Sequence, residues 1–189
     1  MKKILQKDEK VLRLIAKEVP VREIIMPKTR KILKEMSAAL RSQSDGVALA
    51  APQIGYLLRI FVVSSKIFEK NFSRKQEEKT LLNENNIVDE IPEKEVKKIR
   101  DLVFINPKIS KLSRSREWMS EGCLSVRPLY GKTWRSAKAT VTAYDENGKK
   151  FTRGASGLLA QIFQHETDHL NGILFIDQAK DIKEEEPAN

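Results

Sequence analysis

The first clear pattern of apolar and polar positions lies shortly after the start of the chain. Apolar residues there recur at the spacing of one helix face, namely Ile32, Leu33, Met36 and Leu40. Pro27 precedes them, and Thr29 is a residue type that caps helix N-termini. The pattern predicts a helix over residues 29–43, which ends before the turn-forming pair Asp45-Gly46.

Two apolar runs in the middle of the chain predict short strands. Leu57–Val63 reads LLRIFVV, and Leu102–Ile105 reads LVFI and is stopped by Asn106-Pro107. The text between them, about residues 66–101, is rich in charge and predicts a solvated insertion rather than a second domain. We therefore expect one domain over residues 1–189 that carries this insertion.

A hairpin is predicted further along the chain. Lys138–Ala143 reads KATVTA, an alternation typical of a half-buried strand. Asn147-Gly148 follows, and both residue types tolerate the positive φ of a tight hairpin turn. Phe151–Arg153 is the expected return strand.

The last predicted helix begins near Ser156 and ends at Asn171-Gly172, where glycine is a natural residue just past a helix end. Two adjacent stripes run along it: Leu158, Ile162, His165 and His169, and beside them Leu159, Phe163, Glu166 and Leu170. The helix thus turns two histidines and one glutamate toward an apolar interior. The final stretch DIKEEEPAN is expected to be a frayed polar tail.

Composition narrows the class of protein. The chain has 189 residues, 40% of them apolar, and a formal net charge of +9, which favours encounters with polyanions such as ribosomal RNA. A single cysteine argues against a disulfide-stapled secreted protein. The N-terminal text lacks the apolar core of a signal peptide, and no run is long enough to span a membrane. We expect a cytoplasmic protein.

The strongest chemical signal is the HExxH pattern formed by His165, Glu166 and His169. Residues four apart on a helix are neighbours, so two imidazoles can converge on one metal while the glutamate sits one position round. The alternative is a helix with satisfied polar residues. Burying two histidines and a glutamate without a shared ligand would cost considerable desolvation free energy, so a metal is the simpler account.

A catalytic site of this kind needs a third protein ligand and one open position. In the metzincin pattern the third ligand is a histidine after an intervening glycine, but here Phe175 follows Gly172 at that place. In thermolysin-like sites it is a downstream glutamate, and the only ones left are in the tail, at 184–186. Cys123 is the remaining strong candidate. A thiolate with two imidazoles suits Fe(II), Zn(II), Co(II) or Ni(II).

Three stretches together resemble the signature motifs of the peptide deformylase family: GVALAAPQ (Gly46–Gln53), EGCLS (Glu121–Ser125) and QHETDH (Gln164–His169). They occur in the family's order, and the likeness extends over most of the chain. The resemblance implies an α+β fold with mostly antiparallel sheets packed around a central C-terminal HExxH helix, and with an N-terminal helix. It implies a metal-dependent hydrolase that removes the N-formyl group from the N-terminal formyl-methionine of new polypeptides and releases formate.

The resemblance also implies a role for each motif residue. The two histidines and Cys123 would hold the metal, which is Fe(II) in many members. Glu166 would be the general acid and base. The side-chain amide of Gln53 and the backbone N–H of Leu124 would donate to the oxyanion, where one such donor is worth about 10²–10³ in turnover.

Residues near these motifs would bind the substrate, and we expect this set to be Gly46, Val47, Ala48, Arg127, Leu129 and Ile162. Two of them depart from the usual family text. Ala48 stands where the family usually has a glycine, and its methyl is tolerated if the local φ is negative. Arg127 stands where most members continue with proline. It would bind a backbone carbonyl or carboxylate of the substrate, or remain a solvated arginine at the rim.

Two other function classes compete with this hypothesis. A metallopeptidase that cleaves internal bonds is disfavoured by Phe175 and by the context of Gln53 and Cys123. An RNA-binding protein with a structural metal would need a closed set of four ligands, which one cysteine and two histidines cannot supply. RNA modules also display aromatic residues on strands, and aromatics are only 6% of this chain. The expected partners are formyl-methionyl nascent peptides and the ribosome surface near the exit tunnel. We expect the protein to be a monomer and not to associate with a membrane.

Overall fold

The computed structural model describes residues 2–68 and 100–185. Its helices are α1 (Pro27–Arg41) and α4 (Gly157–Leu170), and its short 3-10 helices are η1 (Lys10–Arg13), η2 (Val21–Glu23), η3 (Ala51–Ile54), η4 (Ser65–Phe68) and η5 (Phe175–Asp177). Its strands are β1 (Ala48–Ala50), β2 (Ile60–Val63), β3 (Leu102–Leu112), β4 (Arg116–Gly122), β5 (Leu129–Ser136), β6 (Lys138–Tyr144), β7 (Lys150–Ser156) and β8 (Lys180–Glu184). No helix in these two described ranges is both long and apolar enough to cross a membrane.

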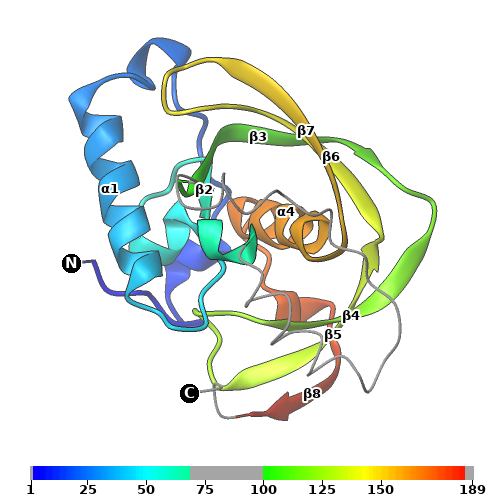
Figure 1. Cartoon of the computed structure of the whole chain (residues 1–189). Helices are drawn as coiled ribbons and strands as arrows, with labels where there is room; N and C mark the ends of the chain where they lie inside the picture. The colour runs from blue at the N-terminus through cyan, green and yellow to red at the C-terminus, as the bar shows by residue number, and fades with distance from the viewer. Residues whose placement is uncertain (1, 69–99, 186–189) are drawn as a thin grey trace.

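The strands form two antiparallel sheets. The larger has the order β1-β2-β3-β6-β7, and the smaller has the order β4-β5-β8. Helix α4 lies between them, with β3, β6 and β7 on one side and β4 and β5 on the other (Figure 1). The predicted architecture, an α+β fold built around the HExxH helix, is confirmed.

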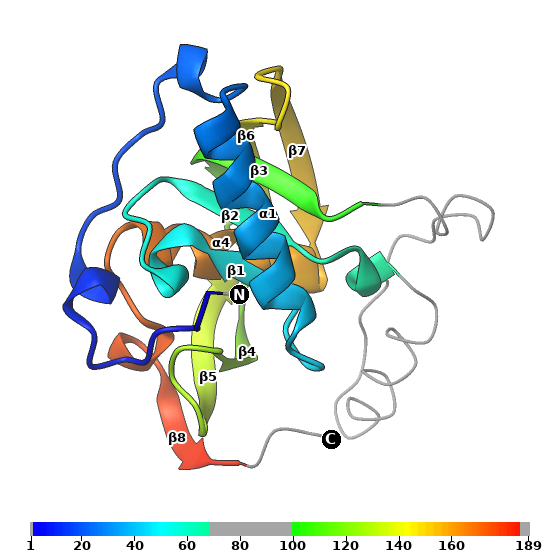
Figure 2. The ribbon, with the colours of Figure 1, turned by 90° about the vertical axis from the view of Figure 1, so that its left-hand side faces the viewer.

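Strand β2 is buried on both faces, which explains its continuous apolar text. Phe61 and Val63 belong to the core cluster that includes Phe163 of α4. Ile60 and Val62 alternate with them and belong to the cluster beneath α1. Helix α1 covers that second face of the sheet (Figure 2). The larger sheet is therefore sandwiched between the two helices.

The first helix begins two residues earlier than predicted. Met26 is its N-cap and Pro27 is its first residue, where the fixed φ of proline suits a helix and its missing N–H is no loss. The prediction of Thr29 as the cap is wrong. Thr29 lies inside the helix, and its hydroxyl donates a hydrogen bond to the carbonyl of Glu23 at 2.7 Å.

Strand β3 does not stop at Asn106-Pro107 but continues to Leu112, so its predicted end is wrong. Asn106 adopts a φ of 51°, and the register of β3 against β6 shifts just after it. The side chain of Asn106 accepts from the N–H of Val19 at 2.8 Å and donates to its carbonyl at 2.7 Å. The irregular residue is thus held by side-chain bonds, and the strand resumes beyond it.

The C-terminal residues are more ordered than expected. Lys180–Glu184 forms β8 on the edge of the smaller sheet, so the prediction that the stretch from Asp181 is a frayed tail is wrong for residues 181–184. Residues 186–189 and most of the predicted insertion, 69–99, lie outside the described residues.

Candidate active site and metal centre

Helix α4 and the end of β4 bring three potential metal ligands together. One ligand atom each from Cys123, His165 and His169 lies within 4.8 Å of the others. The Sγ of Cys123 is 3.2 Å from Nε2 of His169. This separation and the mixture of one thiol with two imidazoles fit a single divalent ion of the Fe(II) or Zn(II) type.

Cys123 directly follows Gly122, the last residue of β4, and Gly122 is covered by the neighbouring strand β5. Gly122 pairs with Tyr130 of β5, and a Cβ added at Gly122 would lie 2.3 Å from the Tyr130 ring. Beyond Cys123 the chain turns, and the N–H of Val126 donates to the Cys123 carbonyl at 3.0 Å. The thiol therefore projects toward α4 from a tight strand end.

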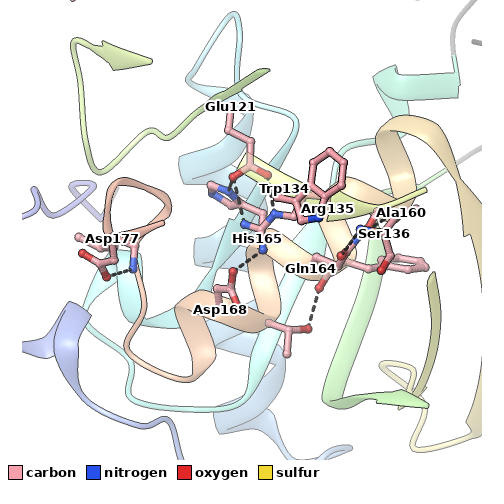
Figure 3. Close-up of polar contacts among 12 residues, drawn as sticks. Glu121, Trp134, Arg135, Ser136, Ala160, Gln164, His165, Asp168 and Asp177 are labelled. Carbon is pink, nitrogen blue, oxygen red and sulfur yellow. Dashed lines mark hydrogen bonds and ion pairs between the residues drawn. The ribbon is translucent and has the colours of Figure 1, made fainter. Parts of the chain in front are cut away.

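Glu121 is buried beside His165 and orients its ring. The Oε2 atom of Glu121 is 3.0 Å from Nδ1 of His165. The two carboxylate oxygens also accept hydrogen bonds from Nε and Nη2 of Arg135 at 2.8 and 3.1 Å. Arg135 in turn donates to Asp168 at 2.6 Å (Figure 3). Because Nδ1 of His165 faces a carboxylate, Nε2 is the nitrogen left to bind a metal.

The same contacts keep Glu121 ionised. Burial favours its neutral form, but hydrogen bonds from His165 and Arg135 outweigh burial and lower the pKa of the Glu121 carboxyl well below its ordinary value. The side chains of Arg135 and Glu121 are only 7% and 3% exposed. The anion beside His165 is therefore shielded from solvent and fixed in place.

Glu166 lies next to His165 on α4 and has a different environment. It is 3% exposed, and among the described residues its Oε2 has no hydrogen-bond partner. Burial raises the pKa of Glu166 to about 7, although the nearby His165 opposes the shift. A carboxyl group of this kind can both take and give a proton near neutral pH.

Gln53 points its amide toward Cys123. Its Oε1 accepts a hydrogen bond from the N–H of Ala50 at 2.7 Å, which fixes the orientation of the amide. Its Nε2 donates to Ser125 Oγ at 3.0 Å and lies 3.6 Å from Cys123 Sγ. Leu124 lies between Cys123 and Ser125, so the Leu124 peptide is close to this amide.

The N-terminal segment contacts both of these residues. The N–H of Leu5 donates to the carbonyl of Gln53 at 2.8 Å, and Nε2 of Gln6 donates to the carbonyl of Leu124 at 3.2 Å. The segment then passes the end of α4, where a Cβ at Gly172 would lie 2.7 Å from the backbone of Arg13. Gly172 is thus required for this close approach.

The apolar residues predicted to bind substrate fall into two groups. Val47, Ala48 and Ile162 lie in or against the cluster between α4 and the larger sheet. Leu129 instead packs in a separate cluster with Cys123. Ala48 has ordinary extended backbone and pairs with Val63, so the methyl group at this position is accommodated without a left-handed conformation.

Arg127 spans from the Cys123 loop to the loop before β1. Its Nη2 donates to Asp45 at 2.5 Å, and its Nη1 donates to Gln43 at 3.1 Å. Gly46 follows Asp45 directly, and a Cβ there would lie 3.1 Å from the side chain of Leu124. Arg127 and Gly46 therefore lie where the two motif loops approach each other.

Comparisons with known proteins identify the family of the chain. The family model described as polypeptide deformylase matches residues 1–185. The chain belongs to the polypeptide deformylase family. It is 34% identical over 178 residues to peptide deformylase 2 of Clostridium acetobutylicum, covering 94% of each chain.

Solved deformylase structures share the fold. A peptide deformylase from Legionella pneumophila superposes with a TM-score of 0.73 at 32% identity, covering 96% of this chain and 87% of that one. A class I type b peptide deformylase from Acinetobacter baumannii with Met-Ala-Ser bound gives a TM-score of 0.72 at 27% identity, covering 94% of this chain and 99% of that one. As a member of this family, the chain is a hydrolase that removes the N-formyl group from newly synthesised polypeptides.

Two residues of this deformylase site escaped the sequence reasoning. Glu121 is part of the EGCLS motif, and its position two residues before Cys123 could have marked it as a site residue. The sequence does not show, however, that its carboxylate contacts His165 and Arg135. Arg135 lies on β5, a strand whose charged and polar text gave no clear alternation. Without that strand, nothing in the sequence brings Arg135 to Glu121.

Proposed function

We propose that this chain is a metal-dependent deformylase whose centre is held by Cys123, His165 and His169. The observation that carries the proposal is the approach of three ligand atoms within 4.8 Å of one another beside a buried glutamate. The proposed natural metal is Fe(II), and Zn(II), Ni(II) or Co(II) would substitute because the same donor set suits them. When bound, the metal supplies Lewis acidity that lets water react near neutral pH.

The chain's own groups would carry the rest of the reaction. The substrate is proposed to be the formyl-methionyl end of a new polypeptide. Gln53 Nε2 and the Leu124 N–H would donate to the formyl oxygen as negative charge develops there. Glu166 would take a proton from the attacking water and return it to the leaving amine, so that the C–N bond breaks and formate and a free N-terminus result.

The substrate would lie between the two motif loops. The proposed contacts are Gly46, Val47, Ala48, Arg127, Leu129 and Ile162. Val47 and Ile162 share one apolar cluster and would take the methionine side chain. Arg127 uses two of its nitrogens for Asp45 and Gln43, which leaves further N–H groups for a peptide carbonyl.

The setting of the enzyme is also a proposal. We propose one catalytic domain over residues 1–189, with the charged text at about 66–101 as an insertion, acting as a monomer in the cytoplasm. Its net charge of +9 supports contact with the ribosome surface near the exit tunnel, where formylated N-termini emerge.

One assay tests the reaction and the roles. The protein is loaded anaerobically with Fe(II), and formate release from formyl-Met-Ala-Ser is measured for the wild type, Glu166→Ala and Cys123→Ser. Glu166→Ala should keep its metal and lose at least about 10²-fold in kcat, whereas Cys123→Ser should lose metal as well. Absence of formate from every metal form of the wild type would exclude the activity. Full activity of Glu166→Ala would overturn the proton-transfer role, and cleavage of casein without deformylation would indicate a peptidase.

A further inference from the structure

The only two tryptophans of the chain lie side by side on the outer face of the smaller sheet. Trp118 on β4 pairs with Trp134 on β5, and their ring centroids are 5.2 Å apart. The two residues are 45% and 42% exposed. Side chains alternate along a strand, so Trp118 faces away from Glu121, which points inward to α4. This aromatic pair is therefore on the opposite side of the sheet from the metal ligands.

Basic side chains surround the pair. Lys180 of β8 places its Nζ 4.9 Å from the centre of the Trp118 ring. Arg116 donates to the carbonyl of Trp134 at 2.9 Å. The other cations at this face are Lys132, which pairs with Lys180 across the strands, and Lys183. We call these four cations and the two tryptophans the tryptophan face.

Carboxylates balance this charge only in part. Asp181 is 3.9 Å from Lys132, and Glu185 pairs with Lys183. These contacts involve side chains that are 44–72% exposed, where ion pairs are weak and readily exchanged for another anion. Arg116 donates instead to the backbone carbonyl of Trp134, and Lys180 lies over the Trp118 ring. The face thus combines excess positive charge with two exposed rings.

We propose that the tryptophan face binds single-stranded RNA, with unpaired bases stacked on Trp118 and Trp134 and phosphates held by the four cations. Exposed aromatic rings on strands within a basic surface are the arrangement by which proteins bind single strands without reading their sequence. RNA is the polyanion that an enzyme acting on newly synthesised polypeptides encounters. The low aromatic content of the chain disfavours an RNA-binding module. It does not disfavour binding at this face, because both tryptophans lie there.

The two tryptophans also provide the measurement, since they are the only ones in the chain. We expect a 12-nucleotide oligo(U) RNA to quench the tryptophan fluorescence of the metal-loaded enzyme, with a Kd of about 10⁻⁴–10⁻⁶ M. With three or four phosphates neutralised, raising salt from 50 to 200 mM should weaken binding about 20- to 50-fold. A duplex RNA of equal charge should bind at least about fivefold more weakly, because its bases are not free to stack.

Two matched variants separate this surface from general charge. Lys132→Glu keeps both tryptophans and should weaken binding at least about tenfold. Lys34→Glu, on the exposed side of α1, changes the net charge equally, and its Kd for the RNA should stay within about twofold of the wild-type value. Trp118→Ala should weaken binding at least about fivefold when followed with a labelled RNA. All three should retain formate release, which shows that they are folded.

Four results would overturn the proposal. These are no quenching by oligo(U) at 50 mM salt, equal binding of duplex RNA, equal loss in Lys34→Glu and Lys132→Glu, or quenching that follows protein concentration alone. The last would mean that the face joins two copies of this chain. Because deformylation is measured separately, failure of RNA binding leaves the proposed reaction untouched.

Discussion

At the scale of single residues, Glu121 connects the proposed metal ligands to the rest of the protein. It orients His165 on one side and neutralises buried Arg135 on the other. Both functions need a charged carboxylate, because His165 and Arg135 both donate hydrogen bonds to it. A neutral amide would place its own N–H donor against one of these two donors. A single atom-for-atom change at this position should therefore affect metal binding and stability together.

The first prediction concerns Glu121→Gln. We expect metal affinity to fall about 10- to 100-fold, since the ring of His165 loses its anionic partner. The free energy of unfolding should fall by about 1–3 kcal/mol, since a charged hydrogen bond to Arg135 is lost. Competition with a chromophoric chelator and thermal unfolding measure the two effects. Glu117→Gln, exposed on the same strand, is the control. Unchanged metal affinity in Glu121→Gln would show that His165 is held by other contacts.

The second prediction concerns the contact between the two motif loops. Arg127→Gln should raise KM for formyl-Met-Ala-Ser about tenfold, since it removes both the bridge and a donor to the peptide. Asp45→Asn should raise KM only about two- to threefold, since it loosens the guanidinium but leaves it in place. Neither should change kcat by more than about twofold. A fall in kcat at constant KM would mean that Arg127 acts on the transition state.

Residues with local signals were those that the sequence could identify. The i, i+4 spacing on one helix paired His165 with His169, and counting ligands pointed to Cys123. Contacts that depend on a distant strand were not accessible. Asp45 is 82 residues from Arg127 in sequence, and no periodicity brings those two side chains together.

At the scale of elements, the pairing of β4 with β5 sets the position of Cys123. The ring of Tyr130 occupies the space where a side chain at position 122 would lie. The strand end can approach β5 closely only because glycine precedes the cysteine.

The third prediction is that Gly122→Ala impairs both stability and activity. The ring of Tyr130 must move, at a cost of about 1–3 kcal/mol, and the strand end that carries Cys123 moves with it. Gly154→Ala is the matched control, because its added Cβ would lie 3.7 Å from Thr140, an ordinary contact. Thermal unfolding and formate release test the pair. Equal behaviour of the two variants would mean that Tyr130 turns aside freely.

Most of the elements that the sequence predicted have a buried face. Strand β7 has none and was predicted from the turn before it, whereas β1 is fully buried but too short to show a pattern. Helices α1 and α4 and strand β2 pack against the core, so their apolar patterns are strong. Strands β4, β5 and β8 were not predicted. Their outer faces are basic and aromatic, and every residue of β8 is exposed. Such strands are fixed by backbone pairing with neighbours, which leaves little trace in hydrophobic spacing.

At the scale of the whole molecule, the N-terminal segment holds distant parts of the fold together. Leu12 is fully buried, and the N–H of Ala16 donates to the carbonyl of Leu170 at 2.9 Å. Arg13 forms an ion pair with Asp177 of η5. Burial opposes the charge of Asp177, but hydrogen bonds from Arg13 and the N–H of Leu174 lower the pKa of the Asp177 carboxyl.

The fourth prediction follows from the sign of that shift. A lowered pKa means that the charged form of Asp177 stabilises the fold above the ordinary carboxyl range, and that this contribution is lost as pH falls through the folded-state pKa. Asp177→Asn should therefore lower Tm at pH 7, and the difference from the wild type should shrink as pH falls below the ordinary carboxyl range through the lowered pKa of Asp177. The effect is small because both side chains are over one third exposed. Asp8→Asn, on an exposed turn of the same segment, should not shift Tm. A pH-independent difference for Asp177→Asn would point to packing instead.

The contacts of the N-terminal segment also fix an order of events during synthesis. The hydrogen bond from Gln6 to Leu124 cannot form until Leu124 has been synthesised. Leu124 lies 118 residues later, which takes about 6–24 s at typical elongation rates. The contact between Cys123 and His169 needs the synthesis of a further 46 residues. Until helix α4 is complete, the thiol lacks its contact with His169. Each new molecule therefore passes through an interval in which the Cys123 thiol, a proposed metal ligand, is open to oxidation before the two histidines beside it have been made.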